Sequence, residues 1–159
     1  MDDPQTPRSR WMGDLPRYAY RGLAAALAIL IMERAANAFA IPLPLVPFVT
    51  SIVLTVTVPE MPAARPYAVI LGHFVSALAG FAIFWTIGQG DIPNALAVAL
   101  ATFAMLVLRA LHPPAALDAF VVTAMGVGSE WLLVPVLAGA LNLALYGRAT
   151  YWLERRLFD

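Results

Sequence analysis

The chain has 159 residues, is 61% hydrophobic and has a mean hydropathy of +0.76. Because typical globular domains are only about 45–50% apolar, it has too few polar side chains to coat a water-soluble fold. Cys is absent and the formal net charge is zero, which excludes disulfides, thiolate metal sites and a Cys nucleophile and argues against a nucleic-acid partner.

The N-terminal residues 1–18 are rich in Asp, Arg and Pro, and they contain no apolar segment followed by a small-residue cleavage site. We therefore expect no secretory signal but a cytoplasmic tail that is disordered or lies on the membrane surface. A single transmembrane domain is expected over residues 19–152, and a second cytoplasmic tail over residues 153–159.

Four apolar stretches come close to the roughly 20 residues that a membrane-spanning helix needs. They are about Tyr20–Ala40, Tyr67–Ile87, Pro93–Leu108 and Trp131–Tyr151. The stretches predict long helices that cross the bilayer.

Two shorter apolar stretches, Pro47–Val58 and Pro113–Gly126, lie between the long ones, and proline opens each. Proline suits the first turn of a helix, where its missing N–H would be unpaired anyway. Pro42, Pro44 and Pro47 therefore predict an extended lead followed by a helix start. At 1.5 Å per residue, each short helix covers only about 20 Å of the roughly 30 Å hydrocarbon core.

The short stretches are either re-entrant, which gives four spans, or they cross with their extended leads, which gives six. With six crossings and a cytoplasmic N-terminus, the arginines fall on the cytoplasmic side, except for Arg34 within the first span. The outer connections then carry Asp91 and Glu130 and no arginine. Since basic loops stay in the cytoplasm, we favour six crossings of the inner membrane with both termini inside.

The order long, short, long occurs twice along the chain. An offset of 114 − 47 = 67 residues superposes Pro47 on Pro114, Ser51 on Asp118, Gly72 on Gly139 and Gly80 on Gly147. With three crossings per copy, the second copy is inverted. We therefore predict an all-α, polytopic transmembrane bundle of two inverted three-helix repeats, in which the second helix of each repeat is short and begins at proline.

The short helices predict a binding site for an anion. The first turn of a helix has unpaired N–H groups and a partial positive charge. Two helices that begin inside the bilayer and enter from opposite faces would aim these groups at one point near the midplane, where an anion can bind.

Three motifs resemble those of the HPP family of integral membrane proteins. They are Pro47-Phe48-Val49-Thr50-Ser51-Ile52-Val53-Leu54, then Ala64-Arg65-Pro66 followed by Gly72-His73, then Leu111-His112-Pro113-Pro114-Ala115. Their order is similar to the family pattern over roughly residues 20–150. The resemblance implies a compact helical membrane domain and, by analogy with characterised relatives, nitrite transport.

This chain departs from the family pattern in the regions that would line a pore. The family usually has Gly-Ala-Ser where this chain has Val49-Thr50-Ser51, and Ala-Gln-Pro-Arg at Ala64-Arg65-Pro66-Tyr67. After His-Pro-Pro it usually has Ala-Gly-Ala, against Ala115-Ala116-Leu117 here.

The candidate substrate-binding residues are polar or helix-starting residues near the expected midplane, with one charge at the outer mouth. They are Thr50, Ser51, His73, His112, Pro113, Pro114, Asp118 and Arg34. An intramembrane carboxylate is costly and usually functional, and we expect Asp118 to be protonated or paired with His112 or Arg34. The alternative is structural: Thr50 and Ser51 bond local carbonyls, the histidines are satisfied core residues, and Arg34 pairs with a Glu.

We predict a channel or carrier for a small monovalent anion, nitrite by resemblance, that works in a lipid bilayer as a homo-oligomer. We expect no enzymatic activity, cofactor or metal, since no catalytic constellation is present. The alternative is a membrane scaffold or sensor subunit that transports nothing. It predicts that Ser51, His112 and Asp118 pack against protein without a connected cavity.

Overall fold

The computed structural model describes residues 7–38 and 46–159, so the expected lead at Pro42 and Pro44 lies outside the described residues. The described part is helical and contains no strand. Its α-helices are α1 (Pro7–Ala38), α2 (Val46–Thr57), α3 (Pro66–Thr86), α4 (Asp91–Val107), α5 (Ala116–Met125) and α6 (Ala138–Phe158). Short helical turns η1 (Pro62–Ala64), η2 (Pro113–Ala115), η3 (Ser129–Leu132) and η4 (Leu133–Leu137) connect them. The all-α class is confirmed.

The two outer helices are longer than the sequence indicated. Helix α1 begins at Pro7, so residues 7–18 of the expected N-terminal tail are helical, and α6 continues through residues 153–158 of the expected C-terminal tail. At the other end of α6, the predicted stretch Trp131–Tyr151 is interrupted. Val134 has an extended backbone (φ −136°, ψ 117°) because the residue before a proline avoids the helical region and Pro135 has no N–H.

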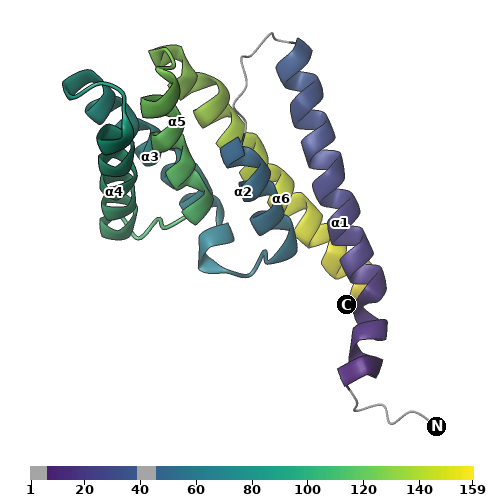
Figure 1. Cartoon of the computed structure of the whole chain (residues 1–159). Helices are drawn as coiled ribbons and strands as arrows, with labels where there is room; N and C mark the ends of the chain where they lie inside the picture. The colour runs from purple at the N-terminus through teal and green to yellow at the C-terminus, as the bar shows by residue number, and fades with distance from the viewer. Residues whose placement is uncertain (1–6, 39–45) are drawn as a thin grey trace.

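Consecutive helices run in alternating directions, as Figure 1 shows. Two contacts fix the ends: Tyr67 at the start of α3 donates to the Leu108 carbonyl after α4, at 2.9 Å. Gln89, between α3 and α4, donates to the Ala124 carbonyl near the end of α5, at 3.2 Å. The starts of α3 and α5 therefore lie at the same end of the bundle as the end of α4.

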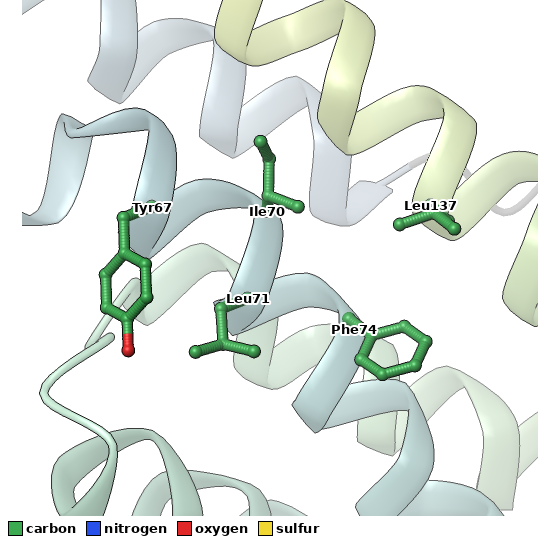
Figure 2. Close-up of a pocket in the computed structure, with 5 residues that line it drawn as sticks. All are labelled: Tyr67, Ile70, Leu71, Phe74 and Leu137. Atoms are coloured by element: carbon green, nitrogen blue, oxygen red, sulfur yellow. The ribbon is translucent and has the colours of Figure 1, made fainter.

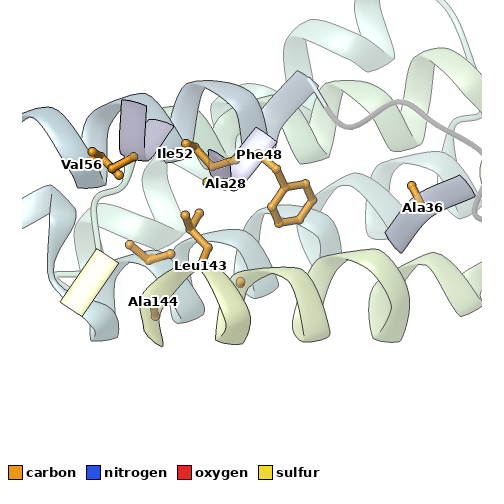
Figure 3. Packing of buried hydrophobic residues seen from close by; sticks show 10 residues of the cluster. Ala28, Ala36, Phe48, Ile52, Val56, Leu143 and Ala144 are labelled. Atoms are coloured by element: carbon orange, nitrogen blue, oxygen red, sulfur yellow. The ribbon is translucent and has the colours of Figure 1, made fainter. Parts of the chain in front are cut away.

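The helices pack as two groups. In the first, α1, α2 and α6 bury small and branched apolar side chains against one another, together with Val69 of α3 (Figure 3). In the second, α3, α4 and α5 meet through buried alanines and through Phe81 and Val122. Helix α3, from the first half of the chain, therefore packs with helices of the second half, and α6, from the second half, packs with helices of the first.

The outside of the bundle is strongly apolar, whereas several polar side chains are fully buried. Trp85 is 68% exposed, Ile92 72% and Leu145 70%, while Ser51, His73 and Asp118 have no exposed surface. A large apolar surface suits contact with lipid. By length and composition alone, two helical segments among the described residues could span a bilayer, Pro66–Thr86 and Ser129–Phe158, and the other apolar helices are shorter.

One end of the first group is held by charged side chains. Arg21 of α1 forms a bidentate ion pair with Glu154 of α6, in which Nη2 lies 2.7 Å from Oε1. Arg21 also donates to the Thr57 carbonyl at 2.8 Å. Arg17 lies 3.5 Å from the same carboxylate. These contacts place the first half of α1 beside the ends of α2 and α6.

Gly80→Ala is expected to destabilise the protein by about 1–3 kcal/mol, because the added methyl group overpacks a tight helix crossing. A Cβ atom at Gly80 would lie 2.9 Å from the Ala119 Cα and O atoms and from the Val122 Cβ. Gly22 of α1 is the matched control, since a Cβ there has nothing within 4 Å. Gly22→Ala should stabilise by about 0.5–1 kcal/mol. Thermal unfolding in detergent micelles measures both, and equal melting temperatures for the two variants would contradict the tight crossing.

Candidate functional site

Four polar side chains from separate segments meet inside the bundle. Ser51 comes from the first turns of α2, His73 from the middle of α3, His112 from the connection before η2, and Asp118 from the first turn of α5. All four have 0% exposed surface. We refer to these four residues as the polar network.

The polar network is a continuous chain of short contacts. The Asp118 Oδ2 atom lies 2.6 Å from His73 Nδ1, and His73 Nε2 lies 2.9 Å from Ser51 Oγ. The same Ser51 Oγ lies 2.8 Å from His112 Nε2. The contacts end at the Ala63 carbonyl of η1, which is 2.7 Å from His112 Nδ1. Both imidazole rings therefore point an Nε2 atom at one hydroxyl oxygen.

Packing fixes the two imidazole rings. The ring of Phe48 stacks on His73, with centroids 4.7 Å apart and planes 5° apart. Gly72 lets the His112 connection approach α3, since a Cβ at Gly72 would lie 2.9 Å from the His112 Cβ. Pro47, in the first turn of α2, helps to place Ser51, because the Ser51 hydroxyl lies 2.8 Å from the Pro47 carbonyl.

Asp118 has one used and one unused carboxyl oxygen. Its Oδ2 bonds His73, whereas Oδ1 is buried and has no hydrogen-bond partner among the described residues. The partner of Asp118 is thus His73, and not His112 or Arg34 as considered from the sequence. A buried carboxyl oxygen without a partner is costly, which is typical of functional rather than packing positions.

The remaining predicted site residues lie outside the polar network. Thr50 is exposed and donates to the Pro47 carbonyl at 2.9 Å. Pro113 is exposed and Pro114 half-buried, and both serve to start η2. Arg34 is exposed on α1, and no bond of the described residues joins it to the polar network.

The start of α5 offers fewer free N–H groups than a bare helix end. In η2, the Ala115 N–H donates to the His112 carbonyl at 2.9 Å, and the Ala116 N–H is bonded within the same turn. One turn later, the Ala119 N–H donates to the Ser76 hydroxyl at 3.2 Å. The side chains of the polar network, more than backbone N–H groups, are therefore what this point offers to a ligand.

Two further residues lie beside the polar network without belonging to it, and the sequence analysis did not single them out: Phe48 stacks on His73, and Ser76 accepts from the Ala119 N–H. Ser76 is buried three residues after His73 and thus on the same face of α3, a spacing that could have indicated it. Nothing in the sequence indicates that Phe48 stacks on His73. Among the described residues, the His and Asp groups do not form a cluster that could hold a metal ion.

Two shallow pockets lie on the surface, away from the polar network. One is an apolar groove between α3 and η4, lined by Tyr67, Ile70, Leu71, Phe74 and Leu137 (Figure 2). The other lies over α4 and Phe120 of α5 and includes Asp91 and Asn94. No residue of the polar network lines either pocket, and all four have no exposed surface, so the polar network is closed within the part of the chain that the structure describes.

The comparisons with known proteins agree with a membrane protein. The family model for the HPP transmembrane region matches residues 12–157. Two Dictyostelium discoideum proteins described only as transmembrane proteins are 36% and 35% identical in alignments 107 residues long, and each alignment covers 62% of this chain. The matched region covers 37% and 34% of their own lengths. No solved structure matches the chain.

Proposed function

The chain belongs to the HPP transmembrane family, and we propose that it carries a small monovalent anion, nitrite by family resemblance, across the membrane. The observation that carries this proposal is the polar network itself: two imidazoles, a hydroxyl and a carboxyl, fully buried in an apolar bundle. In a membrane protein, ionisable side chains at such a position mark substrate or proton pathways by default.

The geometry of the two histidines suits a small anion. His73 Nε2 and His112 Nε2 lie 2.9 and 2.8 Å from the Ser51 hydroxyl oxygen. If α2 withdraws Ser51, an oxygen atom of nitrite or nitrate can take the place of the hydroxyl and accept hydrogen bonds from both rings. Charge-assisted bonds of this kind are about twice as strong as neutral ones.

We further propose six crossings arranged as two inverted repeats. Reciprocal glycine contacts support this arrangement: a Cβ at Gly80 would lie 2.9 Å from the Val122 Cβ, and one at Gly147 would lie 3.2 Å from the Thr55 Cβ. The pairs are related by the predicted offset, since 147 − 80 = 67 and 122 − 55 = 67. Exchanging the two repeats thus converts one contact into the other, as expected for two halves around a pseudo-two-fold axis.

We place the arginine-rich end of the bundle in the cytoplasm of a cell with an inner membrane, and both termini with it. Arg21 bonds the end of α2, and Tyr151 of α6 donates to Glu60 after α2, at 3.0 Å. The connections with Arg65 and Arg109 lie at this end too, through the His112–Ala63 contact. This distribution agrees with the preference of basic loops for the cytoplasm.

Transport is tested by anion flux in proteoliposomes. We expect the protein to move nitrite, nitrate or both along a concentration gradient, at rates well above those of protein-free vesicles. The variant His112→Gln keeps a polar side chain of similar reach but loses the imidazole, and we expect it to lose most of the flux. Folded protein that moves neither nitrite, nitrate, formate nor a halide would refute the proposal.

The alternative, a membrane scaffold or sensor that transports nothing, is favoured by one observation. The polar network is closed, its members contact one another, and neither surface pocket reaches it. Transport therefore requires a second conformation, in which Ser51 separates from the two histidines. An accessibility experiment discriminates: a cysteine at Ser51, the only one in the chain, should react with a water-soluble thiol reagent during transport and stay unreactive in a scaffold.

A further inference from the structure

The positions of the hydrogen atoms in the polar network can be deduced from the Ala63 carbonyl, where its chain of contacts ends. The Ala63 carbonyl can only accept a hydrogen bond, so the His112 Nδ1 atom, 2.7 Å away, must carry a hydrogen. When His112 is neutral, its Nε2 atom therefore carries no hydrogen and offers a lone pair as an acceptor. The Ser51 hydroxyl, 2.8 Å away, must then donate to it.

Ser51 has one hydrogen but two acceptors within reach. Its oxygen lies 2.8 Å from the Pro47 carbonyl as well as 2.8 Å from His112 Nε2. If His112 takes up a proton, its Nε2 becomes a donor, and the Ser51 hydrogen can turn to the Pro47 carbonyl. The polar network can thus accept one proton by rotation of a hydroxyl, without movement of any heavier atom.

The pair of His73 and Asp118 keeps a net charge of zero whether His112 is neutral or protonated. Since Ser51 donates away from His73, the His73 Nε2 atom must carry a hydrogen in order to bond the Ser51 oxygen at 2.9 Å. The remaining contact, His73 Nδ1 to Asp118 Oδ2 at 2.6 Å, then holds a single proton. Whichever atom carries that proton, the charges of His73 and Asp118 sum to zero.

We propose that this chain takes up one proton on His112 for each anion it binds, so that anion and proton cross together. This inference rests on the proposed function. A neutral His112 turns the lone pair of Nε2 toward the anion position, which repels an anion. A protonated His112 presents a second N–H donor and a positive charge that the anion neutralises. By linkage, the bound anion favours the protonated ring to the same extent.

The groups around His112 agree with this assignment. The titratable side chains that face it are His73 from α3 and, through His73, Asp118 from α5, while α2 contributes the hydroxyl of Ser51. The charged residues of the adjacent connections face elsewhere: Glu60 accepts from Tyr151, and Arg65 and Arg109 are exposed. Among the described residues, no carboxylate bonds His112 directly, and the charge of Asp118 is balanced within its pair with His73.

The test uses the fact that the chain has only two histidines, both in the polar network. In protein labelled with ¹⁵N-histidine and reconstituted in lipid, imidazole nitrogen shifts report which atoms carry hydrogen, and His112→Gln assigns the two spectra. At high pH we expect His112 with hydrogen on Nδ1 only and His73 with hydrogen on Nε2. Added nitrate should convert His112 to the imidazolium form at a pH where it is neutral without nitrate.

Two serine variants test whether the Ser51 hydroxyl links the protonation of His112 to the His73 ring, or whether any loss of a buried hydroxyl has the same effect. Ser51→Ala removes the shared hydroxyl, so titration of His112 should no longer move the His73 signals. Ser76→Ala removes another buried α3 hydroxyl, which bonds only the Ala119 N–H in the described contacts, and should leave the spectra unchanged.

The outcomes distinguish the two proposals. Hydrogen on His112 Nε2 alone at high pH, or anion flux with His112 neutral in the presence of saturating nitrate, overturns proton uptake but leaves transport standing. Absence of both flux and any effect of nitrate on His112 overturns transport, and proton coupling with it.

Discussion

Asp118→Ala is expected to lower the free energy of unfolding by about 3–5 kcal/mol, the range seen when one partner of a buried pair is removed. The substitution leaves His73 Nδ1 without the acceptor that now lies 2.6 Å away, in a place with no exposed surface. It also leaves a cavity between α3 and α5. Urea or thermal unfolding in detergent micelles provides the measurement.

Two other substitutions identify the cause of this loss. Asp118→Asn keeps the shape of the side chain and a hydrogen bond to His73, so we expect it to cost much less than Asp118→Ala. Asp91 is also an acidic residue in the first turn of a helix, but it is exposed, and Asp91→Ala should cost about 1 kcal/mol or less. A loss as large for asparagine as for alanine would show that the contact with His73 contributes little.

The sequence predicted the members of the polar network better than their partners. The offset of 67 residues matched Ser51 with Asp118, and in the structure both contact the same residue, His73. The sequence could not identify His73 as the shared partner, because this depends on the rotation of α3 about its axis. Arg34 was predicted as a charge at the outer mouth from its place late in the first span, and that place does not determine which face of α1 the side chain occupies.

Helix boundaries were predicted where proline or glycine marks them. Pro66 begins α3 within one residue of the expected start, and Gly126 ends α5 with a left-handed backbone (φ 63°). The interruption before α6 was missed, although Pro135 is visible in the sequence. In that stretch the apolar composition, which sets the expected length of a span, concealed the local break in hydrogen bonding.

The packing of the helices into two groups could not be predicted from the sequence. An offset relates residues in sequence but does not say that α3 packs with α4 and α5, or that α6 packs with α1 and α2. This exchange places Ser51 in one group and both histidines in the other. A relative movement of the groups would therefore separate Ser51 from the two histidines, which is the conformational change that the proposed transport requires.

The pH dependence of nitrate flux is the second large effect that we expect. The anion meets two donors, the Nε2–H groups of His73 and His112, only when His112 is protonated, so wild-type flux should be highest at low pH. It should fall as pH rises through the titration of His112, approaching tenfold per pH unit beyond it. Flux is measured in proteoliposomes with equal pH on both sides and a gradient of nitrate alone. Nitrate is preferred to nitrite, whose neutral acid crosses lipid unaided and would add a pH-dependent leak.

His112→Gln provides the decisive comparison, since its amide can still donate to the Ala63 carbonyl but cannot titrate. Its residual flux should be at least about tenfold below wild type at low pH and should not depend on pH. Ser76→Ala, which alters a buried hydroxyl outside the polar network, should keep the wild-type slope. If His112→Gln retained that slope, another group would be the proton carrier. If wild-type flux were independent of pH, the anion would cross alone, and the hydrogen-bond order of the polar network would serve packing only.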